Sequence, residues 1–200
     1  VCSAYLLLAC EPDWFGRGCQ YQRHCANNTN CDATVGFHNN DSKCNKGWFG
    51  PGCQYVDLLD SISSVTTQRS ANFKVLMDRD DETCMMNFMT DQLKITWDQP
   101  HIITWMRFYL SNTVVLPSFD IAGTDTTLYT DSKLLPCREV MVSTRIVDVH
   151  CDPVWPAVIQ VTISSRNVTD LCSLYISGGR NVAINRRHHR LAQSFTKVSP

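Results

Sequence analysis

From residue 56 onward the chain consists of short apolar and alternating runs separated by polar segments that contain Pro, Gly, Asn and Asp. Ile95 and Trp97 alternate with polar neighbours, as do Val161 and Ile163. Such alternation is typical of strands that bury one face. The runs cover residues 93–97, 102–110, 118–122, 127–130, 140–149, 157–164 and 172–177. No run has the spacing of an amphipathic helix, so the pattern predicts a mainly β fold, with an antiparallel β-sandwich over residues 56–178.

Residues 10–55 show almost no strand or helix periodicity, and Asn, Asp and Gly fill the gaps between their cysteines. Such a segment cannot bury enough apolar area to offset chain entropy, so disulfides must hold it together. The cysteines are Cys10, Cys19, Cys25, Cys31, Cys44 and Cys53. They include no Cys-x2-Cys pair, which argues against a zinc site. Three bridges among them leave 15 pairings open.

This disulfide-rich segment contains the same octapeptide twice, Trp-Phe-Gly-x-Gly-Cys-Gln-Tyr, at residues 14–21 and 48–55. The copies differ only at Arg17 and Pro51. Two glycines ahead of a cysteine allow positive φ and a sharp turn, while the aromatic residues cover the bridge. The repeat therefore predicts two similar sharp turns within one small cysteine-stapled module.

The cysteine content points to an oxidising, extracellular compartment, because 11 cysteines in 200 residues exceed ordinary cytosolic usage. Asn27, Asn40 and Asn167 begin glycosylation sequons and agree with secretion. The net charge is −1, and the only basic cluster lies near residue 188, so we expect no nucleic-acid partner. No apolar run reaches the length of a membrane span.

Residues 1–9 have the composition of a signal-peptide remnant that ends on a small residue just before Cys10. Cleavage after Ala9 would remove Cys2 and leave an even number of cysteines. The alternative is that Cys2 belongs to a preceding module.

The doubled Trp-Phe-Gly-x-Gly-Cys-Gln-Tyr and the closely spaced cysteines between its copies resemble the laminin-type EGF modules of multiple-EGF-like scavenger receptors. The resemblance implies one EGF-like module over residues 10–55. The sequence lacks the cysteines that this family carries near Arg23 and near Phe37 or His38, so the family's disulfide connectivity is not transferred.

The order of features after Tyr55 resembles the galactose-binding-like sandwich, a jelly roll shared by fucose-binding lectins and coagulation-factor discoidin domains. Ser63-Ser64-Val65-Thr66 stands where that family begins, and residues 76–84 resemble its Asp-Gly-Asn loop, with Asp78-Arg79 in place of Asp-Gly. Residues 93–97 and 102–108 resemble the strand pair that follows. Gly179-Arg180-Asn181-Val182-Ala183 resembles the opening of a fucolectin domain, which implies a linker and a truncated further domain over residues 179–200.

The four remaining cysteines are Cys84, Cys137, Cys151 and Cys172. Cys137 and Cys151 flank the hairpin-like stretch 138–150, which favours a local bridge there and a second bridge between Cys84 and Cys172. The other two pairings stay open.

A calcium site is one candidate for chemistry, because Asp78, Asp80, Asp81 and Glu82 crowd oxygen ligands into five residues. The spacing is not that of an EF-hand. The resembling lectins hold calcium in a loop of this kind, which implies Asp78 and Asp81 as ligands. The alternative is a solvated acidic turn.

Sugar binding is implied by the same resemblance, since fucose-binding relatives grip sugar hydroxyls with one His and two Arg. His101, Arg107, Arg138 and Arg145 are available here, but none stands in the family's spacing. Arg107 alternates along a predicted strand, and its simplest interpretation is a solvent-facing residue.

Catalysis has little support in the sequence. None of the six His lies in a metalloprotease, nucleophile-elbow or Cys/His nucleophile context. His150-Cys151-Asp152 suggests a thiol enzyme, yet Cys151 has a plausible disulfide partner. We therefore expect a non-catalytic extracellular fragment of a cell-surface or secreted receptor that binds glycans, glycoproteins or scavenger-type ligands. The alternative is a structural adhesion spacer that contacts other extracellular proteins and binds no sugar.

Overall fold

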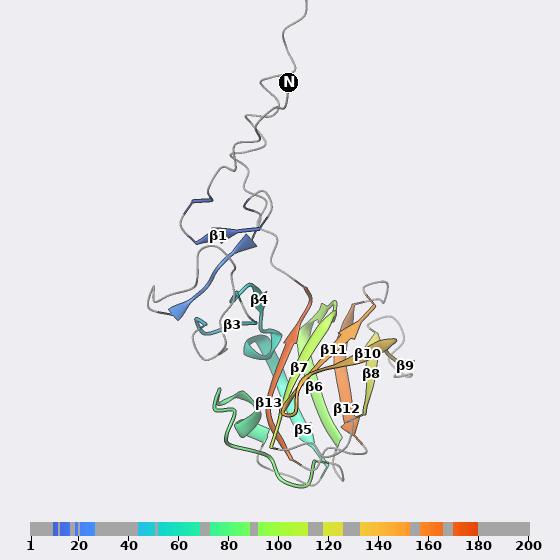
Figure 1. Cartoon of the computed structure of the whole chain (residues 1–200). Coiled ribbons are helices and arrows are strands. Elements are labelled where there is room, and N and C mark those ends of the chain that lie inside the picture. The colour runs from blue at the N-terminus through green and yellow to red at the C-terminus, as the bar shows by residue number, and fades with distance from the viewer. Residues whose placement is uncertain are drawn as a thin grey trace, which may run out of the picture. The chain divides into compact units, whose positions relative to one another are not determined.

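The structure is a computed structural model and describes residues 10–11, 13–16, 19, 21–26, 44–50, 52–68, 73–88, 92–111, 118–125, 133–152, 157–165 and 170–179. Described residues up to Tyr55 belong to one compact unit, and Val56–Gly179 form a second (Figure 1). Several predictions fall outside the described residues: the signal-peptide remnant 1–9, Cys31, the sequons at Asn27, Asn40 and Asn167, the strand 127–130, and the tail from residue 180.

The repeated octapeptide adopts the same local structure in both copies. Strands β1 (Trp14–Phe15) and β3 (Trp48–Phe49) each lead into a glycine with positive φ, 90° at Gly16 and 88° at Gly50. In each copy the cysteine N–H donates to that glycine's carbonyl at 3.0 Å. Strands β2 (Tyr21–Gln22) and β4 (Tyr55–Val56) follow. The two similar sharp turns predicted from the repeat are therefore present.

Disulfides between cysteines close in sequence close these turns. Cys10 is bonded to Cys19 and Cys44 to Cys53, each over nine residues. Cys25 is also disulfide-bonded and forms an isolated β-bridge with Cys44. The EGF-like character of residues 10–55 stays a prediction.

The second unit is a β-sandwich of two antiparallel sheets. One sheet has the order β10-β11-β7-β13 and the other β5-β6-β12-β8-β9 (Figure 1). The strands are β5 (Ile62–Thr67), β6 (Gln92–His101), β7 (Trp105–Leu110), β8 (Phe119–Asp125), β9 (Lys133–Leu134), β10 (Cys137–Ser143), β11 (Ile146–Cys151), β12 (Val158–Ser165) and β13 (Leu171–Ser177). The predicted mainly β fold with an antiparallel sandwich is confirmed.

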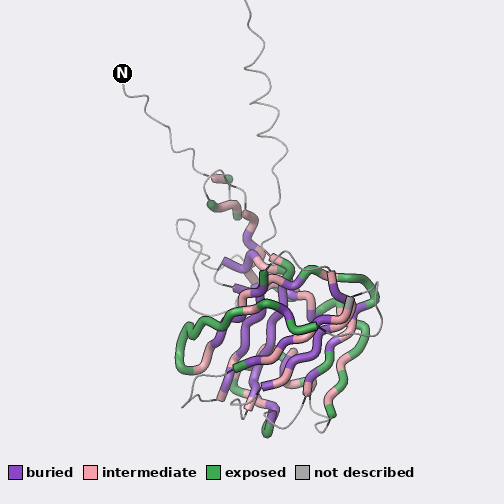
Figure 2. Tube along the Cα trace, turned by 90° about the vertical axis from the view of Figure 1, so that its right-hand side faces the viewer, coloured by how far each residue is buried: buried purple, intermediate pink, exposed green. Residues whose placement is uncertain are grey.

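The alternating residues that predicted the strands form the core between the sheets. Figure 2 shows the central strands as the buried part of the unit, with exposed residues at turns and edges. Ile95 and Trp97 from β6 belong to the same core cluster as Met106 and Phe108 from β7, and all four are at most 2% exposed. Phe108 stacks on Phe119 with ring centroids 4.0 Å apart.

Two short 3-10 helices, η3 (Leu58–Ser61) and η4 (Phe73–Met77), also contribute to the sandwich. No helix was expected from the sequence, because segments of four or five residues are too short to show a helical period. No helix in the described part of the chain is long and apolar enough to span a membrane.

The favoured disulfide pairing of the sandwich is present: Cys84 is bonded to Cys172, and Cys137 to Cys151. With the two bridges near the N-terminus, there are four disulfides in which both cysteines are among the described residues. This number is typical of an extracellular or secreted protein.

Candidate functional site

The structure does not bring together the four residues considered for gripping a sugar. His101 is the last residue of β6 and lies close in sequence to the start of β7. Its ring packs edge-on against that of Trp97, with the ring centroids 5.7 Å apart. Arg145 follows β10 and accepts a backbone hydrogen bond from Leu110 at the other end of β7. These two positions are separated by roughly 17 Å, the length of a six-residue strand. A site that uses both side chains is therefore excluded.

Arg107 does not face solvent, and that interpretation was wrong. Its Nε and Nη2 donate to the Asp148 carboxylate at 2.7 and 2.9 Å, and its guanidinium lies 5.0 Å from the Trp105 ring centroid. Arg107 is 8% exposed and Asp148 7%. Alternation correctly placed Arg107 on the face opposite the core, but Asp148, its register partner on β11, covers it there.

Arg145 is also fully engaged. Nη1 and Nη2 donate to the two carboxylate oxygens of Glu82 at 2.9 and 3.2 Å, Nη2 also reaches the carbonyl of Asp81, and Nε donates to the carbonyl of Leu110. The hydrogen bond from Arg145 lowers the pKa of Glu82. This guanidinium ties the acidic loop to the end of β7 and is not available to a ligand.

The acidic loop uses its carboxylates as turn acceptors. Asp78 accepts from the backbone N–H of Asp80 at 2.8 Å and from the Thr83 hydroxyl at 2.6 Å, and Asp80 accepts from the N–H of Glu82. Arg79 has a φ of 65°. In the part of the chain that the structure describes, no group of three His, Cys, Asp or Glu side chains is placed to hold a metal. Calcium binding at Asp78, Asp80 and Asp81 stays a prediction.

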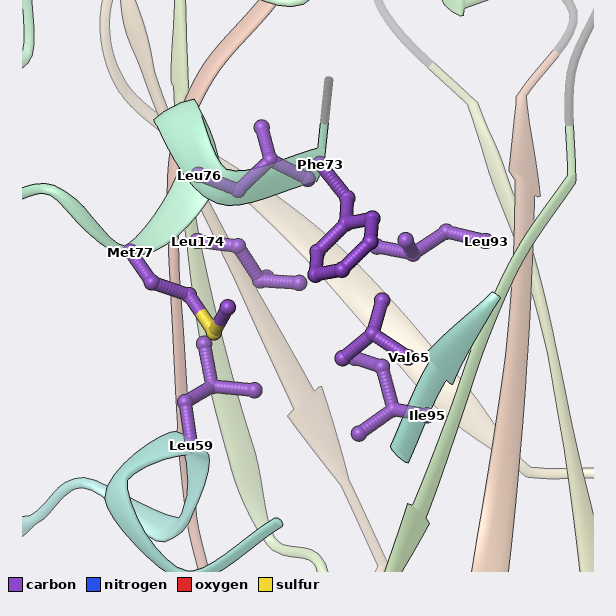
Figure 3. Close-up of a pocket in the computed structure, with 8 residues that line it drawn as sticks. All are labelled: Leu59, Val65, Phe73, Leu76, Met77, Leu93, Ile95 and Leu174. Carbon is purple, nitrogen blue, oxygen red and sulfur yellow. The ribbon is translucent and has the colours of Figure 1, made fainter. Parts of the chain in front are cut away.

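An apolar cavity lies between η3, η4, β5, β6 and β13 (Figure 3). Figure 3 shows the ring of Phe73 between the side chains of Leu93 and Leu174, and the side chain of Met77 pointing toward Leu59. Its volume is about 10 Å³, close to what one water molecule requires. A cavity of this size is a packing imperfection rather than a ligand site.

A larger recess lies at the base of the β10–β11 hairpin. It has a volume of about 520 Å³, within the range of small-molecule sites. We call it the hairpin recess, and the residues that line it are Pro136, Cys137, Arg138, His150, Cys151 and Asp152.

The hairpin recess has a rigid frame. The Cys137–Cys151 disulfide joins directly opposed residues of β10 and β11, and the Asp152 N–H donates to the Pro136 carbonyl at 3.2 Å. His150 stacks on Trp105, with the ring planes 12° apart. Because Cys151 is in a disulfide, it offers no thiol for the enzyme mechanism that the sequence suggested.

Three polar side chains around the recess are uncommitted. Within the described residues, Arg138, His150 and Asp152 make no side-chain hydrogen bond or ion pair, in contrast to Arg107 and Arg145. Arg138 was among the sequence candidates, but its grouping with His150 and Asp152 was missed. The signal was present, since an antiparallel bridge between Cys137 and Cys151 puts Arg138 opposite His150.

No family model matches the chain, and no curated protein matches it. Solved structures that are similar include the CBM32-1 and CBM32-2 domains of Clostridium perfringens ZmpB in complex with GalNAc, with a TM-score of 0.47 and 13% identity over 60% of this chain and 34% of that one. The F5/8 type C domain of a Bacteroides fragilis protein has a TM-score of 0.49 and 14% identity, over 68% of this chain and 99% of that one.

A third similar structure is the Clostridium perfringens module CpGH89CBM32-5 in complex with GalNAc-β-1,3-galactose. Its TM-score is 0.43 and its identity 7%, over 57% of this chain and 94% of that one. The present chain spans about a third of the length of the ZmpB chains that contain the two CBM32 domains.

Proposed function

We propose that this chain is a non-catalytic extracellular recognition module of a cell-surface or secreted receptor and that it binds carbohydrate through the hairpin recess. The observation that carries the proposal is the grouping of three uncommitted polar side chains, Arg138, His150 and Asp152, around one recess. The hydrogen bonds of two other arginines support the proposal, because Arg107 donates to Asp148 and Arg145 donates to Glu82.

The chemistry of the recess suits a neutral sugar. The guanidinium of Arg138 offers a planar fork of donors, and the Asp152 carboxylate offers acceptors, so the pair can bond adjacent hydroxyls that both donate and accept. One permanent cation and one carboxylate balance each other, which gives no preference for a charged glycan. Pro136 supplies an apolar surface for the C–H face of a sugar ring.

The test is a glycan array followed by titration calorimetry with the best neutral glycan. We expect Arg138→Gln and Asp152→Asn each to weaken binding by about tenfold or more. Lys94→Gln is the matched control, because Lys94 is an exposed cation on β6 outside the recess. Each variant must keep the thermal unfolding midpoint of the parent. An array without binders, or binding that both recess variants leave unchanged, would overturn the proposal.

A second candidate function is a structural adhesion spacer that contacts proteins and binds no sugar. It is favoured by exposed apolar residues on strands β9 and β10, which we call the apolar flank: Leu134, Val140, Met141 and Val142. An array without binders, together with protein association that depends on these residues, would select this candidate. In both cases we propose an EGF-like module at residues 10–55 ahead of the recognition domain at 56–178.

A further inference from the structure

Strand β10 is an exposed edge of the four-stranded sheet. It pairs with β11 on one side, and no described residue pairs with its other side. Six of its seven residues are exposed. Val140, Met141 and Val142 are 42%, 39% and 50% exposed, so apolar side chains project from both faces of this edge.

The sheet's opposite edge, β13, is protected. Met85 and Leu171 exchange backbone hydrogen bonds of 2.7 and 3.1 Å, and the Ile176 N–H donates to the Asp57 carboxylate. The edge strand β5 of the second sheet carries mostly Ser and Thr. β10 contains neither Lys nor Pro, the residues that usually block edge pairing, and its one irregularity lies between Met141 and Ser143, next to the turn.

The apolar flank extends across both sheets on this side. β9, the edge strand of the five-stranded sheet, precedes β10 by only two residues and carries Leu134, which is 66% exposed. Unpaired backbone groups and apolar side chains thus occur together along one side of the sandwich, a combination that favours association through the edge.

We propose that β10 pairs antiparallel with β10 of a second copy of this chain, which makes a symmetric dimer that goes beyond the proposed sugar binding. A two-fold axis through Met141, perpendicular to the sheet, places Val140 of each copy opposite Val142 of the other. In the same register Glu139 lies opposite Ser143, the last residue of β10, so no like charges face each other along the paired strands. The strand is therefore complementary to itself in charge and in apolar character.

The dimer has a geometric consequence that also depends on the proposed function. The two-fold axis leaves both copies of Arg138 on the same face of the continuous sheet, about 20 Å apart along the strands. Two hairpin recesses would then face one glycan-bearing surface, and binding of the first would raise the effective concentration of the second. The dimer itself does not depend on sugar binding.

Sedimentation velocity of the whole chain, from micromolar to submillimolar concentration, tests the pairing. We expect a monomer–dimer equilibrium for the parent chain. Met141→Lys places two lysines against each other at the axis and should weaken dimerisation by about tenfold or more. The matched control is Met86→Lys, because Met86 is an exposed methionine, 63% accessible, that lies outside strands β9 and β10.

A charge-exchange experiment tests the register. Met141→Glu should also weaken self-association, whereas an equal mixture of Met141→Lys and Met141→Glu should form the mixed dimer, seen by native mass spectrometry. Thermal unfolding midpoints check that each variant is folded. A parent chain that stays monomeric over this whole concentration range overturns the proposal. A chain that forms no dimer but binds a different protein overturns it as well. So does a dimer that survives Met141→Lys or is equally lost in Met86→Lys. Glycan titration of the same variants keeps this result separate from the proposed function.

Discussion

The carboxylate of Asp57 accepts the backbone N–H of Ile176 at 3.4 Å, so the first residues of the sandwich are tied to its last strand. The same oxygen accepts the N–H of Leu59 and caps η3. Burial raises the pKa of Asp57 to about 7, against the lowering effect of the two N–H groups; nearby Asp60 raises it further, and Arg79 lowers it.

This pKa gives a pH dependence with a definite sign. The folded-state pKa lies above the unfolded value of 3.8. The contribution of protonated Asp57 to folding stability is therefore fully present below about pH 4 and is lost as pH rises through 7. Asp57→Asn keeps the acceptor oxygen but cannot titrate. We expect the stability difference between parent and variant, measured by urea unfolding, to change by on the order of a few kcal/mol between pH 5 and pH 8. Parallel pH profiles would contradict this assignment.

The buried pair of Arg107 and Asp148 predicts a strong asymmetry between single and double variants. Arg107→Met leaves the Asp148 carboxylate buried without its cation and should cost about 3–5 kcal/mol of unfolding free energy. Replacing both, with Arg107→Met and Asp148→Leu, removes both charges and should cost less than either single change. Urea unfolding at neutral pH measures the three variants, and equal losses in single and double variants would argue against a desolvated pair.

The two sandwich disulfides should differ in their contribution to stability. The Cys84–Cys172 bridge spans 88 residues and the Cys137–Cys151 bridge 14. On the chain-entropy model the longer loop is worth about 4–5 kcal/mol and the shorter about 3. Alanine pairs at each bridge, compared by urea unfolding, test this order. A greater loss for the short bridge would mean that native packing, rather than unfolded-chain entropy, sets the difference.

Gly178 lies where a side chain has no room. A Cβ at this position would be 2.6 Å from the carbonyl oxygen of Ile102, which is backbone and cannot rotate away. We expect Gly178→Ala to destabilise the sandwich by about 1–3 kcal/mol. Gly123→Ala is the comparison, because its Cβ would meet the side chains of Val158 and Leu135 and should cost less. Thermal unfolding midpoints of both variants decide the order.

Strands β6 and β12 could be predicted because alternate apolar residues along them enter the core, which leaves a local alternation of apolar and polar positions. Ile95 and Trp97 show this pattern, as do Val161 and Ile163, and all four are core residues. The sandwich disulfides followed from a cysteine on each side of a hairpin-like stretch. The repeated octapeptide predicted its turns because glycine before cysteine is a local signal.

The environment of Arg107 could not be predicted, since Asp148 is 41 residues away and only strand pairing brings it close. The same limit applies to Asp57, which contacts Ile176 across 119 residues. At the hairpin recess, Arg138 and His150 had a readable register, but nothing local indicated that Asp152 lines the same recess. The sequence therefore predicted strands and local bridges well, and long-range polar contacts poorly.

The Cys84–Cys172 bridge also determines how the sandwich would respond to mechanical force. Tension applied at the two ends of Val56–Gly179 reaches the disulfide before it reaches strands β6 to β12, because those strands lie within the covalent loop. On the order of 300 Å of contour length is then shielded from extension. Only the segments before Cys84 and after Cys172 can lengthen, unless a reductant opens the bridge, so an oxidised module under load would extend much less than a reduced one.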